Sequence, residues 1–345
     1  MFRQKHNVVG LDLGSDAVKL VALKGAPHQW RLLCAHRCAC AAAPNSESDV
    51  ADTLPSPERL KEVFQQNRGL SRDVVSSFRG RPVMIQYLDF PKMSHDELRA
   101  AVELEAGEFV TGDLSQMDVD FQVLSQGNGS DKCQVMLVMV PKEVTERRLR
   151  ALHRAGLNPV AIDIDGLALA NAYLGTGERE KKGTVILLNV GATVSNLCIL
   201  RDQALYFVRD INFGGSQITR ALAQATGLAE AEAEQVKCQP ERWAEAKVNM
   251  ESLLQSSAAL LADEVRACIA YCRSRTGLAE VDRLLLTGGS ARLRGLDEFL
   301  CRQLGMPVQV WAPIDEVAAA RKNAPVRAEE SLGPCLTVAL GLAMR

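Results

Sequence analysis

Two segments of the chain combine apolar residues with a glycine turn and a carboxylate or an amide. They are Leu11-Asp-Leu-Gly-Ser-Asp16 and Leu188-Asn-Val-Gly-Ala-Thr193, and each has an Asp or Asn, an apolar residue and a glycine at the same spacing. A glycine turn between two strands points backbone N–H groups outward, and such a group of donors holds phosphate oxygens. Two turns of this kind that face each other would hold a triphosphate from both sides.

The first of these turns also carries side chains suited to a metal-bound phosphate. Asp12 stands directly before the turn, where its carboxylate would bind Mg²⁺ directly or through the water around the metal. Ser15 adds a hydroxyl donor, and Lys19 adds a cation within reach of an anion. Either segment alone also fits an ordinary hairpin turn with no ligand.

A third segment, Leu286-Thr-Gly-Gly-Ser-Ala291, is typical of a buried strand that runs into a pair of glycines before a helix. Glycines at this point let a flat base or a sugar approach the backbone closely, and the helix N-terminus contributes donors. A glycine pair alone is a weak signal. Two phosphate-type turns followed by this third turn favour a nucleotide site.

Apolar runs predict the strands that would position these turns. Val8–Gly14 and Ala17–Leu23 flank the first turn and predict a hairpin, which Trp30–Ala35 extends by a strand. Val185–Asn189 and Asn196–Leu200 predict the same arrangement around the second turn. The two turns therefore begin what we expect to be two halves of the protein.

Residues 83–164 between the two halves alternate in the order β-α-β-β-α-β. Ser94 and Glu97 form a capping box that predicts the start of a helix reaching about Phe109. This order within so short a stretch predicts a small domain inserted into the larger one.

Composition excludes several classes of protein. A chain of 345 residues at roughly 150 residues per domain suggests two domains or slightly more. The formal net charge of −2 argues against a nucleic-acid partner, because phosphate neutralisation needs a basic face. No apolar run is long enough to cross a bilayer, so we expect a cytoplasmic protein without direct membrane insertion. The 10 cysteines form no CxxC pair, and we interpret them as reduced, mostly buried residues.

The order of the motifs resembles the actin, hsp70 and sugar-kinase superfamily of nucleotide-binding proteins, with two phosphate motifs and an adenosine motif. More narrowly, the chain resembles the PilM family, the actin-like proteins of type IV pilus assembly, which are relatives of the division protein FtsA. The resemblance runs from about residue 7 to the C-terminus. The stretches that carry it are Gly10-Leu-Asp-Leu-Gly-Ser, Val18-Lys-Leu-Val, Val102-Glu-Leu-Glu-Ala106, Val119-Asp-Phe-Gln-Val-Leu124, Ile211-Asn-Phe-Gly-Gly-Ser-Gln-Ile-Thr219 and Ala339-Leu-Gly-Leu-Ala343.

This resemblance implies an α/β, two-lobed actin-like ATPase fold with an inserted subdomain of the FtsA type. The second lobe would contain subdomain 2A and a helical subdomain 2B. The implied boundaries are 1–82 for the first lobe (subdomain 1A), completed by 160–184 and the C-terminal helix 331–345; 83–159 for the inserted subdomain 1C; and 185–330 for the second lobe, with 2B at about 223–282.

The resemblance also implies that ATP with Mg²⁺ lies between the lobes. The residues expected to contact the nucleotide are Asp12, Gly14, Ser15 and Lys19 in the first lobe, and Asn189, Gly191, Ala192, Thr193, Gly214, Gly215, Glu234, Lys237, Gly288, Gly289 and Ser290 in the second. Glu234 and Lys237 match a helical motif near the ribose and base, but they also fit a solvated i, i+3 ion pair.

One residue departs from the superfamily pattern. The second phosphate motif normally begins with Asp, and this chain has Asn189. An amide can hydrogen-bond a metal-bound water, but it brings no charge and accepts no proton. Asp163 or Asp165 could supply a second carboxylate, and we take Asp12 with Asp165 as the metal residues; both aspartates also fit a strand-end cap. We therefore expect nucleotide binding with weak or no hydrolysis, and we assign no catalytic residue.

The family further implies an adaptor role. Its expected partner is the N-terminal cytoplasmic peptide of the membrane protein PilN, bound between the first lobe and the inserted subdomain, alongside the pilus platform and its assembly ATPases. Two alternatives are a small-molecule kinase of the superfamily, which would need a base Asp that we do not find, and an FtsA-like polymer. FtsA carries an amphipathic tether after the core, whereas here Arg345 directly follows the expected last helix. Self-association stays open.

Overall fold

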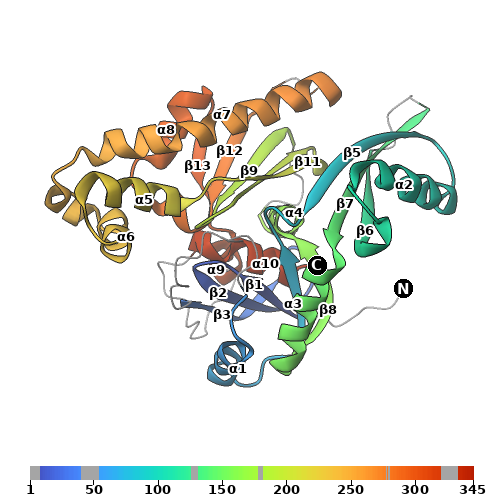
Figure 1. Ribbon diagram of the computed structural model, residues 1–345, viewed down its shortest axis with the longest axis horizontal. Helices are drawn as coiled ribbons and strands as arrows, with labels where there is room; N and C mark the ends of the chain where they lie inside the picture. Colours follow the sequence, from blue (N-terminus) through green and yellow to red (C-terminus); the bar gives the residue numbers. More distant parts are fainter. Residues whose placement is uncertain are drawn as a thin grey trace.

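The computed structural model describes residues 8–39, 54–125, 131–177, 182–276, 278, 280–319 and 333–345. Within these residues the chain forms two five-stranded sheets and one three-stranded sheet, with helices between and around them (Figure 1). Polar residues in the sequence also predict a turn at 126–130, a loop at 44–57 and a charged linker at 178–183; the turn and most of the other two segments lie outside the described residues.

The first sheet has the strand order β3-β2-β1-β4-β8. Strands β1 and β2 form the expected hairpin, and β1, β4 and β8 run parallel. The strands are β1 (Val9–Leu13), β2 (Ala17–Lys24), β3 (Arg31–Ala39), β4 (Asp73–Phe78) and β8 (Asn158–Ile164).

The second sheet repeats this arrangement with the order β11-β10-β9-β12-β13. Here β9 and β10 form the hairpin, and β9, β12 and β13 run parallel. The strands are β9 (Thr184–Val190), β10 (Ser195–Arg201), β11 (Ala204–Ile211), β12 (Arg283–Thr287) and β13 (Val308–Val310).

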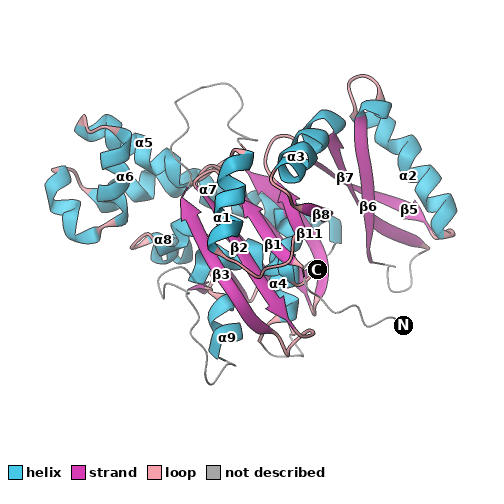
Figure 2. Cartoon of the chain, turned by 90° about the horizontal axis from the view of Figure 1, so that it is seen from below, coloured by secondary structure: helices cyan, strands magenta, loops and turns pink. Residues whose placement is uncertain are grey.

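Helices cover both faces of each five-stranded sheet. In the first lobe, α1 (Pro57–Gln66) and α3 (Lys142–Arg154) bury Leu60, Phe64 and Leu152 against one face (Figure 2). In the second lobe, α5 (Gly215–Thr226), α7 (Met250–Thr276) and α8 (Leu296–Leu304) share one core with the outer face of the sheet. Shorter elements are α6 (Glu230–Cys238), α9 (Pro313–Ala319), and the 3-10 turns η2 (Leu114–Gln116), η3 (Pro240–Ala246), η4 (Gly289–Arg292) and η5 (Gly333–Leu336).

Helices α4 (Asp165–Gly175) and α10 (Thr337–Ala343) cross between the two large sheets. They approach so closely that a Cβ built at Gly341 would lie 1.8 Å from the carbonyl oxygen of Ala168. A Cβ at Gly10 would similarly lie 2.0 Å from the carbonyl oxygen of Ala339, so glycine also lets α10 pack directly on β1. These contacts hold the hairpin strand β1 at the boundary between the two lobes.

The three-stranded sheet has the order β5-β7-β6, and α2 (His95–Phe109) covers one of its faces. Its strands are β5 (Met84–Pro91), β6 (Met117–Ser125) and β7 (Lys132–Pro141). The Ser94 and Glu97 capping box forms as expected at the start of α2. The six-element unit predicted for residues 83–164, however, does not form one sheet. Strand β8 pairs with β4 in the first sheet, because parallel pairing there satisfies its backbone hydrogen bonds on one side, and Leu152 of α3 packs in the core of that lobe.

Tyr87 connects the three-stranded sheet to the second lobe. Its hydroxyl donates to the carbonyl oxygen of Val208 at 2.7 Å and accepts from the Val208 N–H at 2.6 Å. The ring stacks on Phe207 with the centroids 5.0 Å apart. The edge strand β11 is therefore partly closed by a side chain of the inserted sheet.

Candidate functional site

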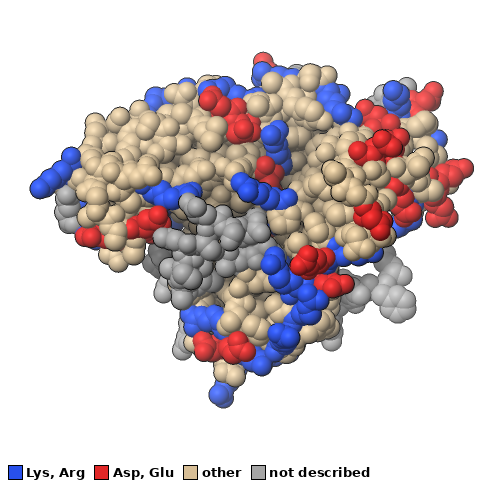
Figure 3. All heavy atoms as spheres, in the orientation of Figure 1, with Lys and Arg blue, Asp and Glu red and all other residues tan. Residues whose placement is uncertain are grey.

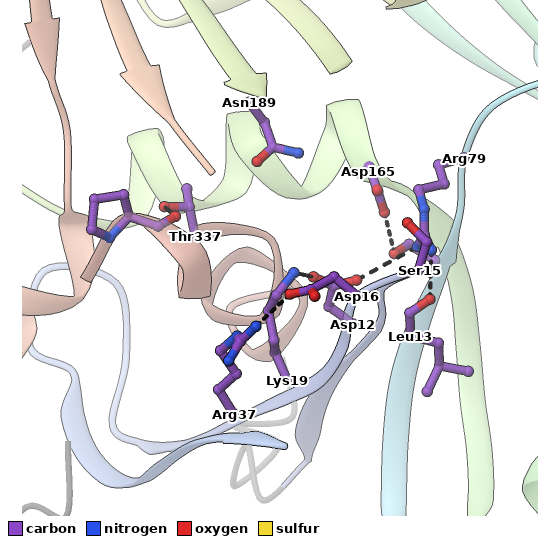
Figure 4. Close-up of polar contacts among 12 residues, drawn as sticks. Asp12, Leu13, Ser15, Asp16, Lys19, Arg37, Arg79, Asp165, Asn189 and Thr337 are labelled. Atoms are coloured by element: carbon purple, nitrogen blue, oxygen red, sulfur yellow. Dashed lines mark hydrogen bonds and ion pairs between the residues drawn. The ribbon is translucent and has the colours of Figure 1, made fainter. Parts of the chain in front are cut away.

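The first hairpin places Asp12 and Lys19 directly opposite each other. Asp12 lies near the end of β1, Lys19 lies on β2, and the two are cross-strand partners in the ladder. The Lys19 Nζ donates to the Asp12 carboxylate at 2.8 Å, and Asp12 is only 4% exposed (Figure 4). Although burial opposes the charged form, the Asp12 carboxylate raises the pKa of Lys19. The turn at Gly14–Asp16 follows directly, so a fixed ion pair lies at its base.

Arg79 is a second cation at Asp12, and the sequence reasoning missed it. It follows the carboxyl end of β4, and its Nη1 lies 3.6 Å from the Asp12 carboxylate. Its Nη2 donates to the carbonyl oxygen of Leu13 at 2.7 Å. Parallel strands end at the same edge of a sheet, and ligands bind at that edge in α/β folds. The position of Arg79 directly after a strand parallel to β1 is the signal that could have revealed it.

Of the two aspartates considered near the lobe junction, Asp165 lies beside this ion cluster. It begins α4, and the hydroxyl of Ser77 donates to its carboxylate at 2.5 Å. Burial raises the pKa of Asp165 to about 7; the Asp12 carboxylate adds to this rise and Arg79 opposes it. Asp163 instead pairs with Arg345 at 3.0 Å. The structure thus associates Asp165, and not Asp163, with the first hairpin.

The second hairpin meets the first through their hydroxyls. Ser15 Oγ lies 3.0 Å from Thr193 Oγ1, so the two glycine turns are in contact across the lobes. Gly191 forms the tight part of the second turn, where a Cβ would lie 2.7 Å from the carbonyl oxygen of Val194. Asn189 lies near the end of β9 and donates through its Nδ2 to Asn196 on β10 at 2.7 Å.

The start of α5 packs on the second turn through the backbone. The N–H of Ser216 donates to the Ala192 carbonyl at 2.8 Å, and that of Gly215 to the Gly191 carbonyl at 2.9 Å. A Cβ at Gly214 would lie 2.5 Å from the Ala192 backbone, so only glycine fits this approach. The predicted Gly214 and Gly215 therefore lie against the predicted phosphate turn.

Lys237 on α6 reaches the same place. It is 4% exposed and donates to the Gly215 carbonyl at 3.0 Å, to Thr219 Oγ1 at 2.9 Å and to Glu234 at 2.6 Å. Burial opposes ionisation of Glu234, but Lys237 and Thr219 lower its pKa. The i, i+3 ion pair of the alternative interpretation therefore forms, but with Lys237 buried and only Glu234 exposed. Thr219 joins this group and was not predicted from the sequence.

The third turn adjoins both the second turn and η5. Ser290 donates to the Gly191 carbonyl at 3.2 Å. Gly288 has a left-handed φ of 93°, and its N–H donates to the Pro334 carbonyl at 3.1 Å. A Cβ at Gly289 would lie 4.0 Å from the sulfur of Cys335. Direct contacts therefore join the second turn to Ser15 of the first turn, to the start of α5 and to Ser290 of the third turn.

The described part of the chain contains no group of three or more His, Cys, Asp or Glu side chains arranged to hold a metal ion. In the same residues, no helix is long and apolar enough to cross a membrane.

Comparison with known proteins identifies the family. Residues 10–345 match the family described as "Type IV pilus assembly protein PilM". The chain belongs to this family. The resemblance noted in the sequence is thereby confirmed over nearly the whole length.

One solved structure agrees with the PilM assignment, and a second shares the fold. A structure described as "PilM-PilN type IV pilus biogenesis complex" superposes with a TM-score of 0.82 at 25% identity and covers 98% of each chain. The ethanolamine utilization protein EutJ of Carboxydothermus hydrogenoformans shares the fold, with a TM-score of 0.55 at 16% identity over 98% of this chain and 89% of that one. The actin-like fold class is therefore confirmed.

The cell division protein FtsA of Streptococcus pneumoniae is 25% identical over 197 residues. This match covers 52% of the present chain and 42% of the FtsA chain, so less than half of that relative is represented. It agrees with the expected kinship between the PilM family and FtsA.

Proposed function

We propose that this chain is an ATP-binding adaptor of the inner-membrane platform that assembles type IV pili. In this proposal it is cytoplasmic and reaches the membrane by binding the N-terminal tail of PilN. The observation that carries the nucleotide part is the 3.0 Å contact of Ser15 with Thr193, which brings two phosphate-type turns from different lobes together. Membership of the PilM family and the likeness to the PilM–PilN complex support the adaptor part.

The nucleotide would lie along the contacts described above. Lys19 and the backbone N–H groups of the two glycine turns suit the phosphates, because a cation and outward-facing donors hold anionic oxygens without a dedicated pocket for each. Lys237 with Glu234, the glycines at the start of α5 and the third turn suit the ribose and base. Both groups of residues meet at Gly191, which the Gly215 N–H and Ser290 both contact.

Magnesium fits the oxygen donors of this site. After burial, the nearby Asp12 carboxylate also raises the pKa of Asp165, and Mg²⁺ is usually held by one or two carboxylates together with phosphates and water. A dedicated protein cage is therefore not required. When bound, the metal would supply positive charge to the phosphates, while Lys19 and Arg79 hold the Asp12 carboxylate in place.

Weak or absent hydrolysis follows from the second hairpin. Asn189 carries no charge and accepts no proton, so it cannot act as a general base. The Asp165 carboxylate is occupied by the Ser77 hydroxyl and lies beside Arg79. A bound nucleotide would then mainly fix the angle between the lobes.

The edge strand β8 offers a place for an extended peptide tail. It is the terminal strand of the first sheet, and Val160 on it is 49% exposed, at a bulge in the ladder with β4. A peptide can add to such an edge through main-chain hydrogen bonds. Burial raises the pKa of Asp163 near the end of β8, and the carboxylate of Asp120 on β6 raises it further. The inserted sheet and β8 therefore face the same region.

Charge favours a tail with a free amino terminus. Figure 3 shows acidic side chains gathered on the side of the molecule where α2 and the three-stranded sheet lie. On these elements, Glu103, Glu105 and Glu108 of α2 and Asp120 of β6 are exposed. The positive N-terminus of a peptide laid between this sheet and β8 would be attracted to these carboxylates.

The nucleotide proposal is tested by mass spectrometry of the purified protein and by titration with a fluorescent ATP analogue. We expect saturable binding that Lys19→Met weakens by about tenfold or more, because a charge-assisted contact is lost. Lys24→Met, on the exposed end of the same strand, is the control. Phosphate release at the rate of a motor ATPase would contradict the proposed weak hydrolysis.

The tail proposal is tested by retention of the protein on an immobilised PilN N-terminal peptide. Val160→Arg should weaken retention by adding a bulky cation to the β8 edge. Val310→Arg is the matched control, because Val310 is also an exposed valine, at 39%, on the terminal strand of the other five-stranded sheet. Equal retention of the two variants would argue against β8, and no retention of the unmodified protein would argue against the adaptor role.

A further inference from the structure

A line of polar side chains crosses three neighbouring strands of the second sheet. Asn196 on β10 lies opposite Asn189 on β9 and opposite Asp210 on β11 in the strand ladders. Asn189 Nδ2 donates to Asn196 Oδ1 at 2.7 Å, and Asn196 Nδ2 donates to Asp210 Oδ1 at 2.7 Å. Asn196 is completely buried, so each of its polar atoms depends on these partners.

The carboxylate at one end sets the direction of the whole line. An ionised carboxylate only accepts hydrogen bonds, so Asp210 requires the NH₂ group of Asn196. The Asn196 carbonyl then faces Asn189, which must donate through its own NH₂ group. The carbonyl oxygen of Asn189 is thereby turned toward the third glycine turn, where a Cβ on Gly288 would lie 2.5 Å from it.

Asp210 also binds the first lobe. The N–H of Gly80 donates to its second carboxylate oxygen. Gly80 directly follows Arg79, whose guanidinium contacts Leu13 and Asp12 of the first hairpin. One carboxylate thus connects the amide of the second hairpin with the segment that holds the first.

We propose that Asp210 is the positioning residue of the second phosphate turn. This turn has the neutral Asn189 in place of a carboxylate, and Asp210, two strands away, supplies the carboxylate that orients it. Through Asn196 it fixes the Asn189 carbonyl oxygen as an acceptor facing the third glycine turn, beside which the proposed nucleotide would lie. An acceptor there suits the water around a magnesium-bound polyphosphate and disfavours bare phosphate oxygens. This inference rests on the proposed nucleotide function for its ligand, but not for its hydrogen-bond network.

Exchanging the two end residues tests the network. In Asn189→Asp, Asn196 would lie between two carboxylates and could donate to only one of them. In the double variant Asn189→Asp/Asp210→Asn the line is satisfied in the opposite direction. The amide introduced at position 210 would donate to the Asn196 carbonyl, and Asn196 would donate to the carboxylate introduced at position 189. The introduced amide's own carbonyl would still accept from the Gly80 N–H. Each end position keeps nearly the same volume in every variant, so packing changes little.

We expect Asn189→Asp to lower the melting temperature by about 5 °C and the double variant to recover most of it. Asp202→Asn, an exposed aspartate of the β10–β11 turn that accepts from the Gly183 N–H, is the control that should give no such rescue with Asn189→Asp. If Asn189→Asp yields no folded protein, the recovery of a folded double variant supports the network in the same way. Additive losses in the double variant would overturn the proposal.

The predicted effect of Asp210 on ligand binding is tested by measuring the affinity for ATP with and without Mg²⁺. Asp210→Asn should turn the Asn189 amide around and weaken Mg-ATP binding by about tenfold, as loss of an orienting partner does in metal sites. The double variant should recover this affinity, because the carboxylate introduced at position 189 again presents an acceptor to the third glycine turn. Unchanged Mg-ATP affinity in Asp210→Asn overturns the positioning role. Failure of the unmodified protein to bind ATP contradicts the proposed function, while the melting temperatures still decide the network.

Discussion

The two hairpins occupy equivalent places in two sheets of the same topology, yet they are built from different chemistry. In both sheets the hairpin strand is central, with an antiparallel partner on one side and a parallel strand on the other. Asp12 faces Lys19 across the first ladder, and Asn189 faces Asn196 at the same place in the second. The first pair is an ion pair, and the second is a pair of neutral amides.

This difference suggests a division of labour between the lobes. The first hairpin carries two cations on one carboxylate, which suits it to compensate the charge of a bound anion. The second hairpin carries no charge of its own, and its polarity is set by Asp210 on a more distant strand. In such a site the first hairpin would bind the phosphates and the second would orient them. This agrees with nucleotide binding without efficient turnover.

Removing the leading polar residue of each hairpin should give unequal losses of stability. Asp12→Ala leaves Lys19 and Arg79 beside an empty, buried position, and we expect it to lower the free energy of unfolding by about 4 kcal/mol. Asn189→Ala leaves the buried Asn196 carbonyl without its donor and should cost about 2 kcal/mol. Urea denaturation measures both. Equal losses would mean that the first hairpin is not held by its ion pairs.

The second hairpin depends instead on close approach of the third turn. In Gly288→Ala a Cβ would lie 2.5 Å from both Asn189 Oδ1 and the Val190 carbonyl, at a left-handed φ. We expect a loss of about 3 kcal/mol from steric overlap and backbone strain together. Gly305→Ala is the matched control, because Gly305 is also left-handed but has nothing within 4 Å of a built Cβ. Its loss of about 1 kcal/mol would be backbone strain alone.

The buried carboxylate of Asp165, beside the charged first hairpin, should also make stability depend on pH. The pKa of Asp165 is raised to about 7 by burial, above the usual value of 3.8, so the folded protein binds a proton that the unfolded chain releases. Its contribution to stability is therefore fully present below about pH 4 and is lost as the pH rises through 7. Asp165→Asn keeps an acceptor for Ser77 and should reduce this loss, by on the order of 2 kcal/mol. Parallel unfolding curves of the two proteins from pH 4 to 8 would contradict the assignment.

Much of the fold could be predicted from the sequence, because short stretches of neighbouring residues indicate its turns and helix ends. The glycine turns between apolar runs identified both hairpins, and the Ser94 and Glu97 capping box identified the start of α2. The placement of β8 could not be predicted, because its apolar pattern suits either sheet and only the tertiary pairing with β4 decides between them. Helix α9 was missed for a different reason: its seven residues carry too short a periodic pattern.

The candidate site divides in the same way. Site residues within the glycine motifs were predicted, because the polar side chain and the glycine turn that positions it are neighbours in the sequence. Arg79, Asn196, Asp210 and Thr219 were not found, because each reaches the site from a regular strand, helix or strand end whose own sequence resembles ordinary structure. Cross-strand register is what joins Asn196 to the site, and register is not visible without the pairing. The domain boundaries expected from the sequence remain predictions.

The smallest expected effect concerns the direct contact between the two hairpins. Ser15 and Thr193 share one hydrogen bond of 3.0 Å between partly buried hydroxyls, so Ser15→Ala or Thr193→Val should each cost about 1 kcal/mol or less. If the contact joins the lobes, the double variant should lose no more than either single variant, which a double-mutant cycle measures. Because this bond is weak, a ligand between the turns could replace it at little cost. Coupling that vanishes when saturating ATP is added would show the nucleotide taking the place of this contact, whereas coupling unchanged by ATP would mean that the turns stay closed on each other.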